Sequence, residues 1–315
     1  MLETLIAALL PIVITLILGF FAGWHHDFSS DQGAILNRMV MLYALPMSLF
    51  AGIIATPKQQ IIDNLAMFGW LAIGMVGGLA FVFVIAHFIF KRSAPVAILQ
   101  ALAISGPAVP FVGVSVLGEI FGGTSVLPIA ICGLLMNLVQ VPLTIMLLSG
   151  NDYASGQQHS TSILSIIGNR IVSALKEPVV WAPILAFVIV LCGFNLSGSL
   201  LDSFTLLGKA TGGVALFASG IILFAQKVKI SSAVCVNTIS KNLILPAIVW
   251  LIMYLCGATI TMQHLVVISL CIPTASIVVI LAVQYKVAEQ EMASSLFVST
   301  LMSMITMGIF IWLFQ

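Results

Sequence analysis

The amino-acid sequence predicts an all-α polytopic membrane protein, with ten transmembrane helices arranged as two inverted five-helix repeats. Three observations lead to this prediction. Of the 315 residues, 61% are hydrophobic and only 7% are charged, whereas soluble domains carry about 25% charged residues. Continuously apolar stretches, long enough to cross a hydrocarbon core of about 30 Å as helices, recur along the chain. Short motifs also recur in the two halves at a nearly constant spacing.

The ten predicted spans are separated by short polar segments. In chain order they cover residues 5–24, 35–55, 65–90, 94–117, 124–149, 179–194, 205–224, 232–256, 264–283 and 292–314. The longest polar segment follows the fifth span, and we interpret residues 150–177 as a cytoplasmic linker. Residues 1–149 are therefore expected to form the first repeat, and residues 178–315 the second.

The basic residues predict the orientation, because short cytoplasmic loops retain Lys and Arg. Of the eleven Lys and Arg residues, we assign nine to the segments after odd-numbered spans, and only Lys58 and Lys209 to the segments after even-numbered spans. Both termini are therefore expected outside the cytoplasm, in a multi-pass protein of the cell (inner) membrane. Lys209 and Lys241 are close to the starts of spans 7 and 8, and we expect both to extend toward the lipid headgroups.

The two halves share motifs at an offset of 166 or 167 residues. The matched pairs are Pro11 with Pro178, residues 49–54 with 216–222, and residues 104–107 with 270–273. Each repeat holds an odd number of spans, so the second copy enters the membrane from the opposite side. Inverted repeats of this kind are common in secondary transporters.

Prolines interrupt spans 4 and 9 at matched positions. A proline removes a backbone donor and clashes with the carbonyl four residues earlier, so neither helix is expected to be continuous. A single kinked helix is common in membranes, but the matched pair predicts two broken helices that cross near the midplane. Their N-terminal ends carry partial positive charge and can bind an anion without a buried Lys or Arg. The residues at the breaks are Ser105, Gly106, Pro107, Ala108, Pro110, Pro273, Thr274 and Ser276.

Asn137 and Gln140 are the most conspicuous neutral polar residues within a span, and they are one helical turn apart in span 5. Two interpretations stay open. The amides form hydrogen bonds between helices, or they donate to a bound carboxylate beside the break in span 4. A weaker polar set on span 10 is assigned to close helix packing and comprises Ser294, Ser295, Ser299 and Thr300.

Several classes of function are disfavoured by the sequence. The net charge of +1, with no basic run beyond Lys91-Arg92, disfavours nucleic-acid binding. An intramembrane enzyme needs an HExxH motif, paired Asp residues or a Ser with a His base at membrane depth, and none is present, so we expect no enzyme and no cofactor. The titratable candidates for a cation-coupled exchanger are His87 and Glu119, near span ends, and we expect His87 to be structural. The cysteines show no metal-binding spacing and are expected to be buried apolar residues: Cys132, Cys192, Cys235, Cys256 and Cys271.

Four short motifs together resemble the auxin efflux carrier family, in particular its bacterial malonate-carrier and malate-permease-like members. They are Leu45-Pro46 before Leu49-Phe50, Leu216-Phe217 before Gly220, residues 241–246 and residues 176–183. The resemblance covers all ten spans. It implies that spans 1, 2, 6 and 7 form a scaffold and homodimer interface, while spans 3–5 and 8–10 form a transport domain that moves like an elevator. Many members have a Pro-Asn pair where this chain has Pro107-Ala108, which disfavours auxin as cargo.

We therefore expect a secondary transporter of small organic anions such as malonate or malate, working by alternating access within membrane lipid. The expected donors to the carboxylate are the two half-helix ends together with Asn137, Gln140, Ser105 and Thr274. A cation-coupled solute or ion exchanger on a related crossed-helix fold is the alternative.

Overall fold

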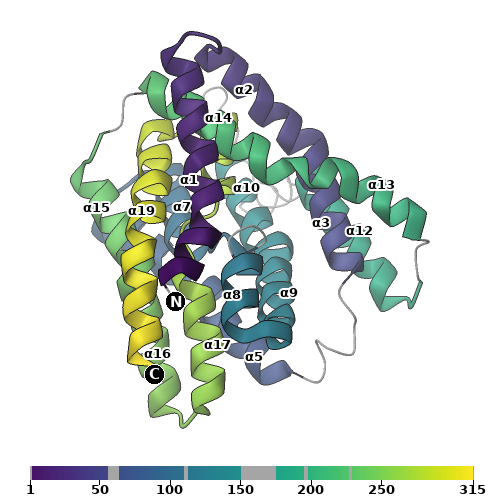
Figure 1. Ribbon diagram of the computed structural model, residues 1–315, viewed down its shortest axis with the longest axis vertical. Helices are drawn as coiled ribbons and strands as arrows, with labels where there is room; N and C mark the ends of the chain where they lie inside the picture. Colours follow the sequence, from purple (N-terminus) through teal and green to yellow (C-terminus); the bar gives the residue numbers. More distant parts are fainter. Residues whose placement is uncertain are drawn as a thin grey trace, which may run out of the picture.

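The computed structural model describes residues 2–55, 64–109, 113–149, 175–194, 198–226 and 229–314 (Figure 1). Within these ranges the chain is helical, and the one pairing of extended backbone is an isolated bridge. The α-helices of the first half are α1 (Leu2–Trp24), α2 (Ser30–Met39), α3 (Leu45–Ile54), α5 (Leu65–Ala72), α6 (Gly78–Val84), α7 (Ala94–Ser105), α8 (Val114–Phe121), α9 (Val126–Leu135) and α10 (Val141–Ser149). Those of the second half are α12 (Pro178–Leu191), α13 (Gly198–Gly208), α14 (Ala210–Gln226), α15 (Ser232–Ile239), α16 (Leu245–Leu255), α17 (Ile260–Cys271), α18 (Ile277–Gln284) and α19 (Glu289–Leu313).

Five wider π turns join some of these helices end to end. They are η1 (Val40–Ala44), η2 (Ile73–Gly77), η3 (Ile85–Ile89), η6 (Met136–Gln140) and η7 (Ser240–Ile244). Three of them, η1, η6 and η7, end two residues before a proline: Pro46, Pro142 and Pro246. A proline ring clashes with the carbonyl four residues earlier, and here that carbonyl lies inside the wider turn, so the helix continues past the proline.

Helices occupy each of the ten predicted segments. Among the residues that the structure describes, five helices are long and apolar enough to cross a membrane: Ser30–Ile54, Leu65–Ile89, Leu127–Leu148, Gly198–Ala225 and Ser232–Leu255. A sixth is added if the bent pair Glu289–Ser303 and Ile305–Leu313 counts as one span. The total of ten spans stays a prediction. The seventh predicted segment begins earlier than expected, because its helix already starts at Gly198. Most of the predicted linker, residues 150–174, lies outside the described residues.

Elements of matching length recur in the two halves. Both α5 and α15 have eight residues and are followed by π turns, η2 and η7, at an offset of 167 residues. Both α7 and α17 have twelve residues, at an offset of 166. The repeat seen in the motifs is therefore also present in the lengths of the helices.

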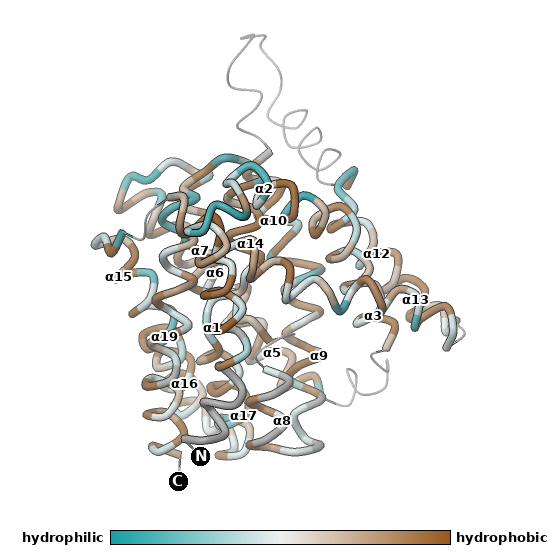
Figure 2. The backbone as a smooth tube through the Cα atoms, turned by 45° about the horizontal axis from the view of Figure 1, so that its top comes forward, coloured by the Kyte–Doolittle hydropathy of each residue, from teal (hydrophilic) through white to brown (hydrophobic). Residues whose placement is uncertain are grey.

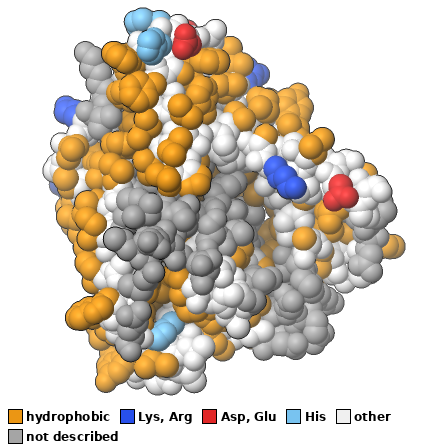
Figure 3. Space-filling model, in the orientation of Figure 1, with side chains coloured by type: hydrophobic (Ala, Val, Ile, Leu, Met, Phe, Trp, Pro, Cys, Tyr) orange, Lys and Arg blue, Asp and Glu red, His pale blue; other side chains and the backbone are white. Residues whose placement is uncertain are grey.

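The broken helices form the core, and the other helices surround them. Ten of the twelve residues of α7 are buried, as are six of the eight in α18. By contrast, outer helices expose large apolar side chains such as Leu18, Leu255 and Trp312. Hydrophobic side chains predominate among the described atoms of the face in Figure 3, and in Figure 2 hydrophilic positions gather at the upper edge. A helix that is apolar all round is typical of a core, and an apolar exterior is typical of a protein in lipid.

Candidate functional site

The breaks in α7–α8 and α17–α18 lie at the predicted prolines, and the two breaks cross each other. The chain leaves α7 after Ser105 and runs extended through Pro107, where it pairs antiparallel with Thr274. The Ala108 N–H donates to the Pro273 carbonyl at 2.9 Å, and the Ala275 N–H donates to the Gly106 carbonyl at 3.1 Å. These bonds satisfy backbone groups that a broken helix would otherwise leave unpaired in the membrane. We call residues 106–108 and 272–276 the crossing. Pro110 lies outside the described residues.

Two predicted substrate donors form hydrogen bonds to backbone groups near the end of α7. The Gln140 side-chain amide donates to the Met75 carbonyl at 2.9 Å, to Ser105 Oγ at 3.0 Å and to the Ser105 carbonyl at 3.4 Å. The Thr274 hydroxyl donates to the Ala103 carbonyl at 2.9 Å. Because helix ends leave free carbonyls, these contacts fit the interhelical hydrogen-bonding interpretation of Gln140.

Lys241 supports the end of α17 in a comparable way. It lies in η7 with a relative exposure of 0%, and its Nζ donates to the Leu270 carbonyl at 3.2 Å. The prediction that Lys241 reaches the headgroups is therefore wrong. Lys241 lies within the helix Ser232–Leu255. Its partner, the Leu270 carbonyl, is near the C-terminus of α17, and carbonyls at that end of a helix interact favourably with a cation. Lys209 also lies within a candidate span, Gly198–Ala225, so without these two lysines the split of basic residues between the two sets of segments becomes eight to one.

A chain of polar groups links the crossing to α19. Asn242 Nδ2 donates to the Ser299 carbonyl at 2.9 Å, and the Ser299 hydroxyl donates back to Asn242 Oδ1 at 2.8 Å. Ser299 Oγ also accepts from the Thr274 N–H at 3.3 Å. Sequence reasoning assigned Ser299 to helix packing and did not single out Asn242. Both belong to the polar framework of the crossing.

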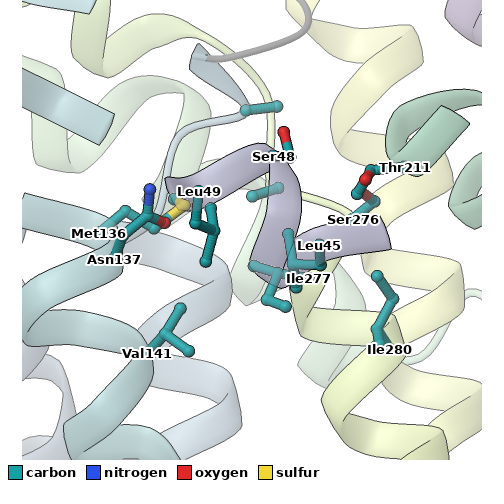
Figure 4. Close-up of a pocket in the computed structure, with 12 residues that line it drawn as sticks. Leu45, Ser48, Leu49, Met136, Asn137, Val141, Thr211, Ser276, Ile277 and Ile280 are labelled. Atoms are coloured by element: carbon teal, nitrogen blue, oxygen red, sulfur yellow. The ribbon is translucent and has the colours of Figure 1, made fainter. Parts of the chain in front are cut away.

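A cavity of about 40 Å³, called the inner cavity, lies beside the crossing (Figure 4). Its polar wall residues are Ser48, Asn137, Thr211 and Ser276, and its apolar ones are Leu45, Leu49, Ala108, Met136, Val141, Ala275, Ile277 and Ile280. In Figure 4 Asn137 lies on one side of the view, and Thr211 and Ser276 lie on the other. The Thr211 hydroxyl is buried with no hydrogen-bond partner among the described residues. Helix α18 begins at this cavity, which places the positive end of its dipole there.

The structure divides the predicted site residues into two groups. Those that line the inner cavity are Ala108, Asn137 and Ser276. Those that build the crossing and the end of α7 are Ser105, Gly106, Pro107, Gln140, Pro273 and Thr274. Sequence reasoning missed Ser48 and Thr211. The position of Ser48 directly before the repeated Leu49-Phe50 motif was the one available signal.

His87, a remaining ionisable candidate, is not among the residues that line the inner cavity. Arg92 forms an ion pair with Glu291 at 2.7 Å, and the Arg92 carbonyl lies 2.9 Å from His87 Nδ1. Because His87 also stacks on Phe83, with ring centroids 5.6 Å apart, its contacts are those of a structural residue. The side chain of Glu119 lies outside the described residues.

The cysteines differ in part from the prediction. Cys132 and Cys271 are buried as expected, but three others are exposed: Cys192, Cys235 and Cys256. In the part of the chain that the structure describes, no group of His, Cys, Asp and Glu residues is arranged to hold a metal ion.

Comparison with known proteins gives one family and one type of relative. Residues 4–311 match the membrane transport protein family, Mem_trans. The uncharacterized transporter YfdV of Escherichia coli K12 is 32% identical over 314 residues, which cover 99% of this chain and 98% of the relative. The uncharacterized transporters YfdV of Escherichia coli O157:H7 and Shigella flexneri match to the same extent.

Proposed function

Because the chain belongs to the membrane transport protein family, which is the auxin efflux carrier family indicated by its motifs, we propose that it carries small organic anions across the cell (inner) membrane. The proposed cargo is a short carboxylate of the malonate or malate type. The observation that carries the proposal is the inner cavity, where a helix N-terminus and several neutral donors meet at a crossing of broken helices.

The wall of the inner cavity suits a carboxylate. Hydroxyl groups come from Ser48, Thr211 and Ser276, and an amide comes from Asn137. No acidic side chain is among the residues that line it, so nothing on the wall repels a bound anion. The N-terminal end of α18 adds partial positive charge in an environment of low dielectric. The apolar remainder of the wall fits the short carbon chain between the carboxyl groups.

The size of the inner cavity supports alternating access. About 40 Å³ holds roughly three water molecules, at about 10–15 Å³ each. A dicarboxylate with seven or more heavy atoms needs more room, so the walls must separate before cargo enters. Residues from α3 and α14 form one side, and the crossing, η6 and α18 form the other. These two sides belong to the proposed scaffold and transport domains, which supports an elevator-type movement of one against the other.

Two further features belong to the same proposal. The matched lengths of α5 with α15 and of α7 with α17 support two inverted five-helix repeats. The distribution of basic residues, eight to one, supports both termini outside the cytoplasm. A homodimer formed through the scaffold helices is implied by the family resemblance.

Ligand-dependent thermal unfolding of the purified protein tests the proposal. A ligand that binds only the folded state at 100 times its dissociation constant adds about 2.7 kcal/mol of stability. We expect malonate, malate or a close relative to raise the unfolding temperature selectively, with and without sodium. A shift produced by a cation or a neutral solute, with none by any carboxylate, would overturn the substrate class and favour the cation-coupled exchanger.

A further inference from the structure

A second and larger cavity lies between α3 and α13. Its volume is about 380 Å³, and we call it the vestibule. One face of α3 lines it with Ser48, Ala51, Gly52 and Ala55, and α13 with the turn after it lines it with Leu201, Thr205, Gly208 and Lys209. The volume lies within the range of about 300–1,000 Å³ typical of small-molecule sites. Small side chains on α3 leave this space open.

The vestibule narrows to the point where the two helices touch. A Cβ placed on Gly208 would lie 2.9 Å from Ser48 Cα, so the two backbones are in direct contact there. From this contact the lining residues extend to Ala55 on α3 and to Leu201 on α13. Ser48 therefore stands at the closed end of the vestibule.

Ser48 also lines the inner cavity. The two cavities thus share one wall residue, and that residue is in contact with Gly208. The vestibule therefore adjoins the inner cavity at Ser48.

Lys209 lies beside this contact, in the turn between α13 and α14 and within the candidate membrane span Gly198–Ala225. It is eleven residues after the start of the helix Gly198–Ala225, which corresponds to about 16 Å along the axis. The side chain is exposed, lines the vestibule, and has no ion-pair partner among the described residues. A lysine at membrane depth normally faces a partner or water, and such residues mark ion and substrate paths.

We propose that the vestibule is the entry path for the carboxylate cargo and that Lys209 captures the anion before it passes Ser48. This inference rests on the proposed function and adds a binding step to it. The lysine raises the local concentration of anions at the closed end of the path, as a charged cleft with apolar walls does. Lys209 contributes to the initial binding of the anion, and the anion occupies the inner cavity during the conformational change.

The first test is uptake of malonate and malate into proteoliposomes. We expect Lys209→Gln to raise KM about fivefold with kcat within twofold, and Lys209→Arg to restore most of the loss because it keeps the charge. Lys229→Gln is the matched control, since Lys229 is also exposed but lies on a different segment, outside the vestibule. An unchanged KM in Lys209→Gln would overturn the capture role.

The second test measures how strongly the vestibule attracts anions, and it does not depend on transport. Ala55→Cys is introduced into a chain whose exposed cysteines are replaced by serine: Cys192, Cys235 and Cys256. The rates of labelling by an anionic and a cationic methanethiosulfonate reagent are compared, with Lys209 present and with Lys209→Gln. We expect the anionic-to-cationic ratio to fall about threefold or more when the lysine is removed.

The two tests separate the two proposals. An unchanged labelling ratio together with carboxylate uptake by the unsubstituted chain overturns the vestibule role and leaves the proposed function standing. A fall in the ratio without uptake of any carboxylate supports anion capture by Lys209 and overturns the proposed cargo.

Discussion

Replacement of Gln140 by leucine distinguishes its two interpretations. The side chain is fully buried and donates to the Met75 carbonyl and to both oxygens of Ser105. In Gln140→Leu the Ser105 carbonyl loses its donor, and an unsatisfied buried group costs about 1–3 kcal/mol, whereas the Met75 carbonyl keeps the hydrogen bond from the Gly78 N–H. Gln140 Oε1 is itself buried without a partner among the described residues, so its removal returns about 1–3 kcal/mol. The two effects offset, so Gln140→Leu is expected to be about 1–3 kcal/mol less stable than a leucine variant that removes only an unpaired oxygen.

The measurement is the free energy of unfolding in mixed micelles, from titration with a denaturing detergent. Gln100→Leu is the matched control, because Gln100 is 6% exposed and its Oε1 has no partner among the described residues. We expect the control to be neutral or slightly stabilising. The reasoning is refuted if Gln140→Leu is no less stable than Gln100→Leu. If Gln140→Leu is as stable as the unsubstituted protein but malonate no longer stabilises it, Gln140 is a substrate donor rather than a support for α7.

Three further predictions concern the inner cavity, the crossing and the packing around it. Asn137→Ala should raise the apparent dissociation constant for malonate severalfold in the thermal-shift titration, and an unaltered affinity would assign Asn137 to packing. Pro107→Ala and Pro273→Ala should both reduce proteoliposome uptake while folded protein stays in the membrane; full uptake in both would contradict the crossing as the transport element. Gly220→Ala should lose about 1–3 kcal/mol of unfolding free energy, because its new Cβ meets the backbone of α1. Gly213→Ala has open space around its new Cβ and should be neutral or stabilising in the same titration.

Prolines were the most informative residues for predicting the fold. Pro107 and Pro273 predicted the two breaks correctly, because the loss of a backbone donor and the clash with a carbonyl are local effects. Their matched positions also predicted that the breaks belong together. The sequence did not predict that Pro46, Pro142 and Pro246 sit just after π turns, since the adjustment depends on packing around each helix.

The candidate site was harder to predict than the fold. The sequence shows that Lys241 is charged but not which group it contacts, so it was expected at the headgroups. Its partner is the Leu270 carbonyl of a different helix. Gln140 and Asn137 were indistinguishable in sequence, although only Asn137 lines the inner cavity. Ser48 and Thr211 went unnoticed because single hydroxyl residues are common in membrane helices.

The hydrogen bonds of the crossing also constrain how the chain is assembled during its synthesis. The Ala103 carbonyl receives its donor from Thr274, 171 residues later in the chain, and the Ala108 N–H depends on Pro273. Until that later segment has entered the bilayer, the first half holds a broken helix with open polar groups that lipid cannot satisfy. While only the first half has been synthesised, its open polar groups therefore need shielding by water or by the insertion machinery. Co-expression of the two halves as separate polypeptides should recover folded protein only if they meet before either is degraded.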